Sequence, residues 1–143
     1  MVLFLDFDGV LHPKGAGQTH FTRLPLLELF LRQNDLAPTR IVITSTWREA
    51  YSLPRLRSFF SPDIAARIAG VTPKLEDYSS EYERGEEVEA WLAGLPLVPW
   101  VALDDEAENY APRLRKRLVQ CDGRLGLLET DLEKMRGILV VAS

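Results

Sequence analysis

Two carboxylates and a glycine stand close together near the amino terminus, in the segment Asp6-Phe7-Asp8-Gly9. If the backbone is extended here, side chains alternate, and the carboxylates of Asp6 and Asp8 point the same way. Two neighbouring carboxylates repel each other, and a magnesium ion would relieve that repulsion because it prefers oxygen ligands. One carboxylate could then attack a phosphorus atom while the other moves protons. The same residues are common in acidic turns after a strand, but their position directly after an apolar segment favours a site.

Polar residues also follow two later apolar segments. Asp104 and Asp105 follow residues 100–103, and the triplet Thr44-Ser45-Thr46 follows residues 41–43. Acidic side chains in this position could hold a divalent cation, and hydroxyls could hydrogen-bond a phosphoryl group. Both groups have a plainer explanation as well, because Asp, Ser and Thr are the residues that best cap the start of a helix.

Five short segments rich in apolar and branched residues predict buried strands. They are residues 2–5, 41–43 and 100–103, with a fourth candidate at 117–121 and a weaker one at 67–71. Apolar residues at helical spacing predict helices between and after these strands. The helical segments are residues 24–31, with Thr22 as the N-cap, 86–92 and 130–139, with one or two short helices within 53–68.

Strands that alternate with helices predict a three-layer, Rossmann-like α/β fold, in which a parallel sheet carries helices on both faces. We expect a single domain over residues 1–143, since no linker or internal repeat marks a second one. Ligands of such sheets bind beyond the carboxyl ends of the strands, where the strand order reverses. The polar residues that follow the strands should therefore meet in one crevice.

The composition is that of a globular protein with enough apolar residues for a core. The 143 residues are 46% hydrophobic and 27% charged, with a formal net charge of −4 and a pI of about 5.2. Such a mildly acidic chain is not built as a general polyanion binder. The single cysteine, Cys121, excludes an internal disulfide and a cysteine-pair zinc site. We find no transmembrane run and no secretory signal, and therefore expect a cytoplasmic protein without a membrane partner.

The segment Asp6-Phe7-Asp8-Gly9-Val10 resembles the first motif of the haloacid-dehalogenase (HAD)-type phosphohydrolases, and the resemblance extends across nearly the whole chain. It implies that Asp6 is a nucleophile that becomes transiently phosphorylated, and that Asp8 is the general acid and then the base. It also implies that Mg²⁺ is bound by Asp6, by the backbone carbonyl of Asp8 and by Asp104 of the fourth motif. Asp105 would bind the ion through water or orient a ligand. An Asp at both positions of the first motif is typical of the phosphatases of this superfamily.

The second and third motifs of this superfamily each have two candidates here. The second motif supplies a hydroxyl that binds the phosphoryl group, and Thr44 and Ser45 both match it. The third motif supplies a cation at the start of a helix, and Arg84, before residues 86–92, is preferred to Lys74. Arg84 has a plainer explanation as a surface cation that pairs with neighbouring acids. The sequence does not separate Thr44 from Ser45, and it leaves Lys74 open as the competitor of Arg84.

A finer resemblance rests on three short strings, Leu11-His12-Pro13, Ser45-Thr46-Trp47-Arg48 and Leu103-Asp104-Asp105. They are similar to those of HAD domains found in multi-enzyme RNA repair proteins, which suggests a nucleotide or a nucleic-acid end as substrate. His12 and Arg48 are then candidate substrate contacts, and so is Lys74. The alternatives are a loop histidine for His12 and an arginine that anchors its helix for Arg48. For Trp47, core packing is preferred to base stacking.

The resemblance predicts a Mg²⁺-dependent phosphomonoester hydrolase with no cap domain or a minimal one. The segments between the motifs, residues 9–43 and 46–83, are too short to hold a separate folded domain over the site. An open site can accept a bulky phosphorylated substrate. The alternatives are a phosphotransferase, a non-catalytic or regulatory binding module, and a metal-dependent nuclease. The oligomeric state is not set by these patterns.

Overall fold

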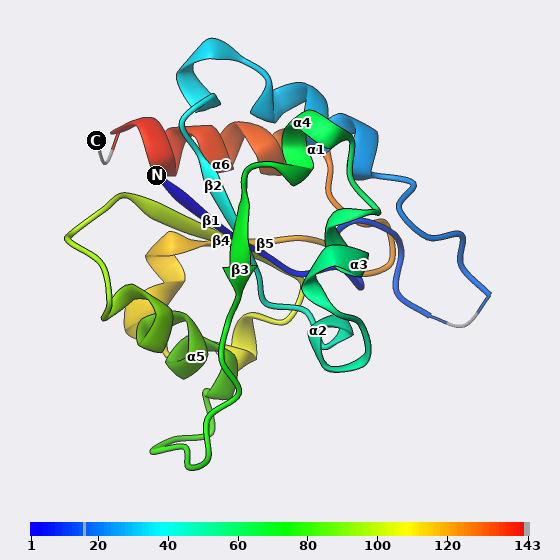
Figure 1. The fold of residues 1–143 in the computed structure, drawn as a ribbon. Coiled ribbons are helices and arrows are strands. Elements are labelled where there is room, and N and C mark those ends of the chain that lie inside the picture. Colours follow the sequence, from blue (N-terminus) through cyan, green and yellow to red (C-terminus); the bar gives the residue numbers. More distant parts are fainter. Residues whose placement is uncertain (16, 142–143) are drawn as a thin grey trace.

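The computed structural model describes residues 1–15 and 17–141, and its centre is a five-stranded parallel sheet with the strand order β3-β2-β1-β4-β5 (Figure 1). The strands are β1 (Val2–Leu5), β2 (Arg40–Ile43), β3 (Ile68–Val71), β4 (Trp100–Asp104) and β5 (Leu118–Gln120). All five predicted strands are present, with bounds shifted by a single residue at most. The predicted α/β fold with a parallel sheet is therefore confirmed.

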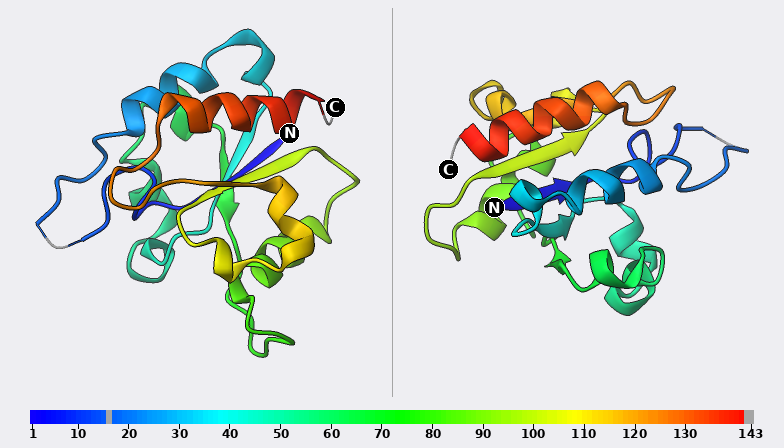
Figure 2. Two further views of the ribbon diagram at one scale, coloured as in Figure 1. Left: turned by 180° about the vertical axis from the view of Figure 1, so that it is seen from behind. Right: turned by 90° about the horizontal axis from the view of Figure 1, so that it is seen from above.

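Helices cover both faces of the sheet, and Figure 2 shows α1 and α6 lying side by side on one face. The α-helices are α1 (Leu24–Leu31), α2 (Trp47–Ala50), α3 (Leu53–Arg57), α4 (Pro62–Ala65), α5 (Glu83–Leu92) and α6 (Glu129–Val141). Short 3₁₀ turns are η1 (Asn34–Leu36), η2 (Ala107–Asn109) and η3 (Pro112–Arg117). Among the described residues, no helix combines the length and the apolar character that crossing a membrane requires.

Helix α1 begins at Leu24 as predicted, but its N-cap differs from the prediction, and helix α5 begins earlier than predicted. Thr22 is not the N-cap of α1, because Arg23 occupies that position and makes no side-chain capping bond. Pro25 in the first turn has no backbone N–H, so one of the donors that an N-cap side chain would satisfy is missing. The helix can therefore begin without a side-chain cap. Helix α5 begins at Glu83 rather than at Glu86, so Arg84 lies inside its first turn.

The sheet buries apolar side chains on both of its faces. Along β1, Leu3 and Leu5 face the core under α1 and α6, whereas Val2 and Phe4 face the smaller core under α5. This alternation is what an extended strand imposes. Because both faces are covered, β1 is apolar throughout, and polar groups are available only beyond its end at Asp6.

The strand order reverses at β1, which pairs with β2 on one side and with β4 on the other. In the register of the sheet, Leu5 is level with Ile43 and with Leu103. The residue after each of these three therefore emerges at the same height above the sheet edge. The sheet thus delivers the polar residues that follow β1 and β2, and the last residue of β4, to one point.

Candidate active site

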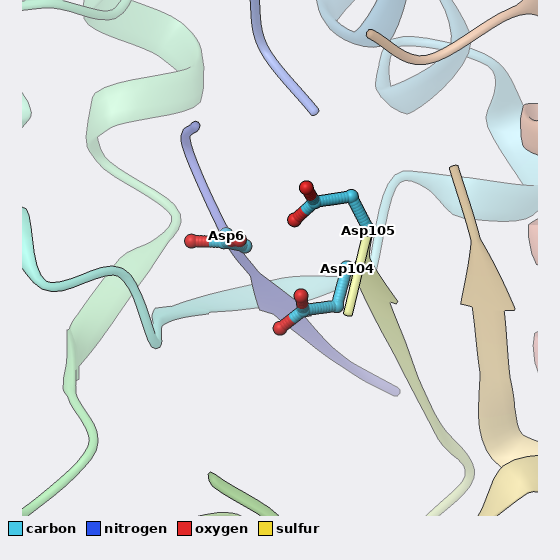
Figure 3. A group of neighbouring side chains, drawn as sticks. All are labelled: Asp6, Asp104 and Asp105. Carbon is cyan, nitrogen blue, oxygen red and sulfur yellow. The ribbon is translucent and has the colours of Figure 1, made fainter. Parts of the chain in front are cut away.

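Three carboxylates converge beyond the ends of β1 and β4. Asp6 follows β1, Asp104 is the last residue of β4, and Asp105 comes next. Each offers an oxygen atom, and these oxygens all lie within 4.8 Å of one another. Figure 3 shows the three side chains next to one another, with the carboxyl groups of Asp104 and Asp105 directed to the side on which Asp6 lies. Such a cluster of hard oxygen donors is the kind that binds a divalent cation such as Mg²⁺.

Arg84 is the cation that contacts both Asp6 and Asp104 of this cluster. Its Nη1 atom lies 3.3 Å from Oδ1 of Asp6 and 3.1 Å from Oδ2 of Asp104. Lys74 instead pairs with Glu49, and its side chain is 68% exposed. Lys74 and Arg84 both line a polar pocket of about 210 Å³ that opens beside the cluster. The geometry therefore favours Arg84 over Lys74 for the third motif and leaves Lys74 at the rim of the pocket.

Burial makes the carboxylates of the cluster costly to ionise. Desolvation raises the pKa of Asp6 well above its ordinary value, and the charge of Asp104 adds to the effect, whereas Arg84 and the Phe7 N–H oppose it. Burial also raises the pKa of Asp104, against the lowering effect of Arg84. Burial alone would lower the pKa of Arg84, but Asp6 and Asp104 outweigh it and the guanidinium stays charged. The cluster has two nearby cations, Arg84 and Lys14, and Lys14 also pairs with Glu106. These two positive charges do not balance the negative charges of the three clustered carboxylates and Glu106, so a divalent cation would be favoured there.

Asp105 is held in a cradle made by two glycines. A Cβ atom on Gly9 would lie 2.4 Å from Oδ2 of Asp105, and one on Gly123 would lie 2.6 Å from the same oxygen. Gly9 also has a φ of +78°, which a side chain would disfavour. Lys14, from the loop after β1, places its Nζ 3.5 Å from Oδ2 of Asp105. The carboxylate of Asp105 is therefore packed closely enough to stay in one place, as a cation ligand must. The oxygen atoms of the three carboxylates are ligands that fit Mg²⁺.

Replacing Gly123 by Ala is expected to weaken Mg²⁺ binding about tenfold, because the added methyl group must displace the carboxylate of Asp105. Calorimetric titration with Mg²⁺ measures the affinity directly. Gly137→Ala is the matched control, since a Cβ there meets nothing within 4 Å. Equal Mg²⁺ affinity in the two variants would mean that Asp105 is not a ligand.

Asp104 is oriented by groups from three other positions. Besides Arg84, the backbone N–H of Glu106 donates to its Oδ1 at 3.0 Å, and the hydroxyl of Tyr110 lies 3.4 Å from its Oδ2. Burial and the charge of Asp104 raise the pKa of Tyr110, so this hydroxyl remains a donor. Tyr110 was not predicted, since a tyrosine in a turn after a strand carries no recognisable signal.

The two hydroxyl candidates of the second motif have different surroundings. The Oγ atom of Ser45 accepts a hydrogen bond from the backbone N–H of Trp47 at 3.2 Å, at the start of α2. The hydroxyl of Thr44 is buried and has no hydrogen-bond partner among the described residues. Leaving a buried hydroxyl unpaired is costly, so Thr44 is the one that gains most from a ligand. The N-cap of α2 is Thr46, whose side chain makes no capping bond, and Ser45 instead binds the first N–H of the helix. Thr44 is therefore the better candidate for the phosphoryl group.

Asp8 lies outside the three-carboxylate cluster, with its side chain 42% exposed. Its Oδ1 is 2.8 Å from Nε2 of His12, and its Oδ2 accepts a hydrogen bond from Nε1 of Trp47 at 3.1 Å. His12 is only 1% exposed, so it is not a loop histidine that is open to solvent. At this degree of burial its side chain does not form a surface for direct contact with substrate. Trp47 packs against the core as expected. The arrangement leaves one side of the Asp8 carboxyl open to solvent.

The guanidinium of Arg48 is taken up by other parts of the protein. It donates to the carbonyl oxygens of Thr44, Ser45 and Thr72, and its Nη2 lies 2.9 Å from Glu87 of α5. Arg48 therefore ties the end of β2 to α5 from a position with little exposure. These contacts match the anchoring alternative, with Glu87 as the acid. Arg48 also lines the polar pocket beside Lys74 and Arg84, so its contact with substrate stays a prediction.

A parallel α/β sheet with acidic residues after β1 and at the end of β4, and a cation from a later helix beside them, defines a domain of the HAD-like class. The family model for the HAD domain in Swiss Army Knife RNA repair proteins matches residues 2–132, and the chain belongs to this family. The resemblance seen in the short motifs is thereby confirmed. No match was found among curated proteins or among solved structures.

Proposed function

We propose that this protein is a Mg²⁺-dependent phosphomonoester hydrolase that acts through a phosphorylated Asp6. The observation that carries the proposal is the convergence of Asp6, Asp104 and Asp105 with Arg84 at the sheet edge. Membership of the family supports a phosphohydrolase-type function. The residues that would hold Mg²⁺ are the three carboxylates, with the backbone carbonyl of Asp8 that the resemblance implies. When bound, the ion supplies positive charge to the phosphoryl oxygens.

The first step transfers the phosphoryl group to Asp6. A carboxylate oxygen of Asp6 attacks phosphorus, and the bond from phosphorus to the leaving oxygen breaks. Asp8, protonated at this stage, gives its proton to that oxygen, so the leaving group departs as an alcohol. Arg84 and the hydroxyl of Thr44 hold the phosphoryl oxygens, and the guanidinium balances charge that would otherwise collect between Asp6 and phosphorus.

The second step releases phosphate by hydrolysis. The carboxylate of Asp8 takes a proton from water, and the water oxygen attacks phosphorus. The bond from phosphorus to Asp6 breaks, which frees inorganic phosphate and restores the Asp6 carboxylate. Asp8 is again protonated, so both residues are ready for a further cycle.

We propose that the substrate is a nucleotide or a nucleic-acid end. The leaving group must lie next to Asp8, and the surface there carries flat rings. His20 lies 5.0 Å and Tyr51 5.4 Å from Trp47 between ring centroids, and Tyr51 is 41% exposed. Such rings can stack on nucleobases. The family name, which refers to RNA repair, supports the same class, and the described residues contain no folded cap over the site.

A panel of phosphate esters tests the function. It contains p-nitrophenyl phosphate, glycerol phosphate, mononucleotides, 5′- and 3′-phosphorylated oligonucleotides and an unphosphorylated oligonucleotide, each with Mg²⁺ and with a chelator. We expect release of inorganic phosphate only with Mg²⁺, faster from the nucleotide or oligonucleotide ends than from glycerol phosphate. Cutting of the unphosphorylated strand would instead indicate a nuclease, and phosphate transfer to an added alcohol would indicate a phosphotransferase. No turnover of any ester would favour a binding module.

A further inference from the structure

We infer that His12 and Trp47 clamp the carboxyl group of Asp8 and so act as positioning residues for proton transfer to the leaving group. The inference rests on the proposed function, in which Asp8 is the general acid and base. It concerns residues that do not touch the phosphoryl group themselves.

Each oxygen of the Asp8 carboxyl has its own N–H donor. Nε2 of His12 lies 2.8 Å from Oδ1, and Nε1 of Trp47 lies 3.1 Å from Oδ2. The two donors come from different elements, since His12 is in the loop after β1 and Trp47 is the first residue of α2. A carboxyl held at both oxygens cannot rotate freely, although its side chain is 42% exposed. Its plane is therefore set by the protein rather than by solvent.

The ring of His12 is fixed in turn by the backbone of Phe21. The Phe21 N–H donates to Nδ1 of His12 at 3.2 Å, so this nitrogen carries a lone pair and the proton lies on Nε2. That tautomer is the one that can donate to Asp8. Phe21 has a φ of +63°, a left-handed conformation that is costly for a bulky residue. A strained residue that orients the donor of the proposed acid is the kind of feature found at functional sites.

The indole of Trp47 is held by aromatic neighbours and by its own backbone. Its ring lies 5.5 Å from Phe7, 5.4 Å from Phe21 and 5.7 Å from Phe59, measured between centroids. Its backbone N–H donates to Oγ of Ser45. Because the ring is packed on several sides, its N–H direction is fixed before any substrate binds. The pair of donors thus forms a rigid support for a half-exposed acid.

Positioning of a general acid matters most when the leaving group is poor. A good leaving group departs with little help from a proton, whereas a poor one requires the proton at the moment of bond breaking. A merely structural role for Trp47 would slow all substrates alike. Phenyl phosphate and p-nitrophenyl phosphate have nearly the same shape and differ in leaving-group strength, so they separate the two cases.

The test compares Trp47→Phe with wild type on these two esters in saturating Mg²⁺. The variant keeps an aromatic ring and loses only the N–H donor and the larger ring. We expect kcat for phenyl phosphate to fall about tenfold and kcat for p-nitrophenyl phosphate to change by less than about twofold, with KM unchanged for both.

His12→Leu should act in the same way, and His12→Gln, which keeps a donor, should recover part of the loss. Trp100→Phe, at the far end of β4, is the matched control and should match wild type.

A second measurement remains informative if Trp47→Phe fails to fold. In the Asp8→Ala protein, whose changed side chain is half-exposed, the indole N–H signal of Trp47 should shift in a ¹⁵N–¹H spectrum, while those of Trp91 and Trp100 stay in place. An unmoved Trp47 signal, or an equal loss on both esters, overturns the clamp but leaves the proposed function standing. A wild-type protein that turns over neither ester overturns the proposed function and the clamp with it.

Discussion

Asp6→Asn protein is expected to lose phosphatase turnover by on the order of a hundredfold or more. The amide cannot act as the nucleophile, so no phosphorylated intermediate can form at this position. The measurement is kcat on p-nitrophenyl phosphate in saturating Mg²⁺. A second readout is a fluoroberyllate adduct, which should form on wild type and not on the variant.

Loss of activity in this variant should not come from loss of the fold. Burial raises the pKa of Asp6 in the folded protein, and Asp104 adds to the shift. The ionised carboxylate therefore opposes folding, and this cost grows as the pH rises from the unfolded pKa through the folded one. Because Asn carries no charge, the metal-free variant should unfold at the same temperature as metal-free wild type at neutral pH, or higher. Turnover at the wild-type rate by a folded Asp6→Asn protein would refute the nucleophile assignment.

Mg²⁺ is expected to stabilise the wild-type protein strongly at neutral pH. An ion that binds only the folded chain adds about 2.7 kcal/mol at a concentration of about a hundred times its dissociation constant. The physical source is relief of repulsion among the buried carboxylates of Asp6, Asp104 and Asp105. Thermal or urea unfolding with and without Mg²⁺ measures the effect.

Asp104→Asn should abolish most of this stabilisation. The variant removes the carboxylate that shares Arg84 with Asp6, and an amide oxygen is a weaker ligand than a carboxylate. Asp122→Asn serves as the matched control, because that carboxylate pairs with Arg124 on the surface. If Mg²⁺ stabilises the Asp104→Asn protein as much as wild type, the ion binds elsewhere and the proposed site is incorrect.

The fold could be read from the sequence because its signals are local. The segment Val2–Leu5 is uniformly apolar, and an acidic pair follows it directly, so both the strand and its end are visible in a few residues. The start of α5 was less visible, because Glu83 and Arg84 are polar and add nothing to an apolar helical pattern. Glu86 accepts hydrogen bonds from Ser79, which fixes the loop in front of this helix in a way that spacing does not reveal.

The site was predictable only where its residues follow a strand. The sequence favoured Arg84 over Lys74 without excluding Lys74, and the path of the chain after β3 decides which of them reaches Asp6. The close packing of Asp105 against Gly9 joins segments that are far apart along the chain. Contacts of this kind depend on tertiary packing, which no local pattern encodes. The role of Tyr110 beside Asp104 was missed for the same reason.

The level alignment of Leu5, Ile43 and Leu103 across three paired strands also bears on how the protein is made. Because β4 is the fourth of the five strands in chain order, a growing chain carries Asp6, the proposed nucleophile, long before it carries Arg84 and Asp104. We therefore expect the chain to gain affinity for Mg²⁺ late in its synthesis, when β4 pairs with β1. A truncated chain that ends before residue 100 lacks Asp104 and Asp105, so at the proposed site it should bind Mg²⁺ far more weakly than the full chain does.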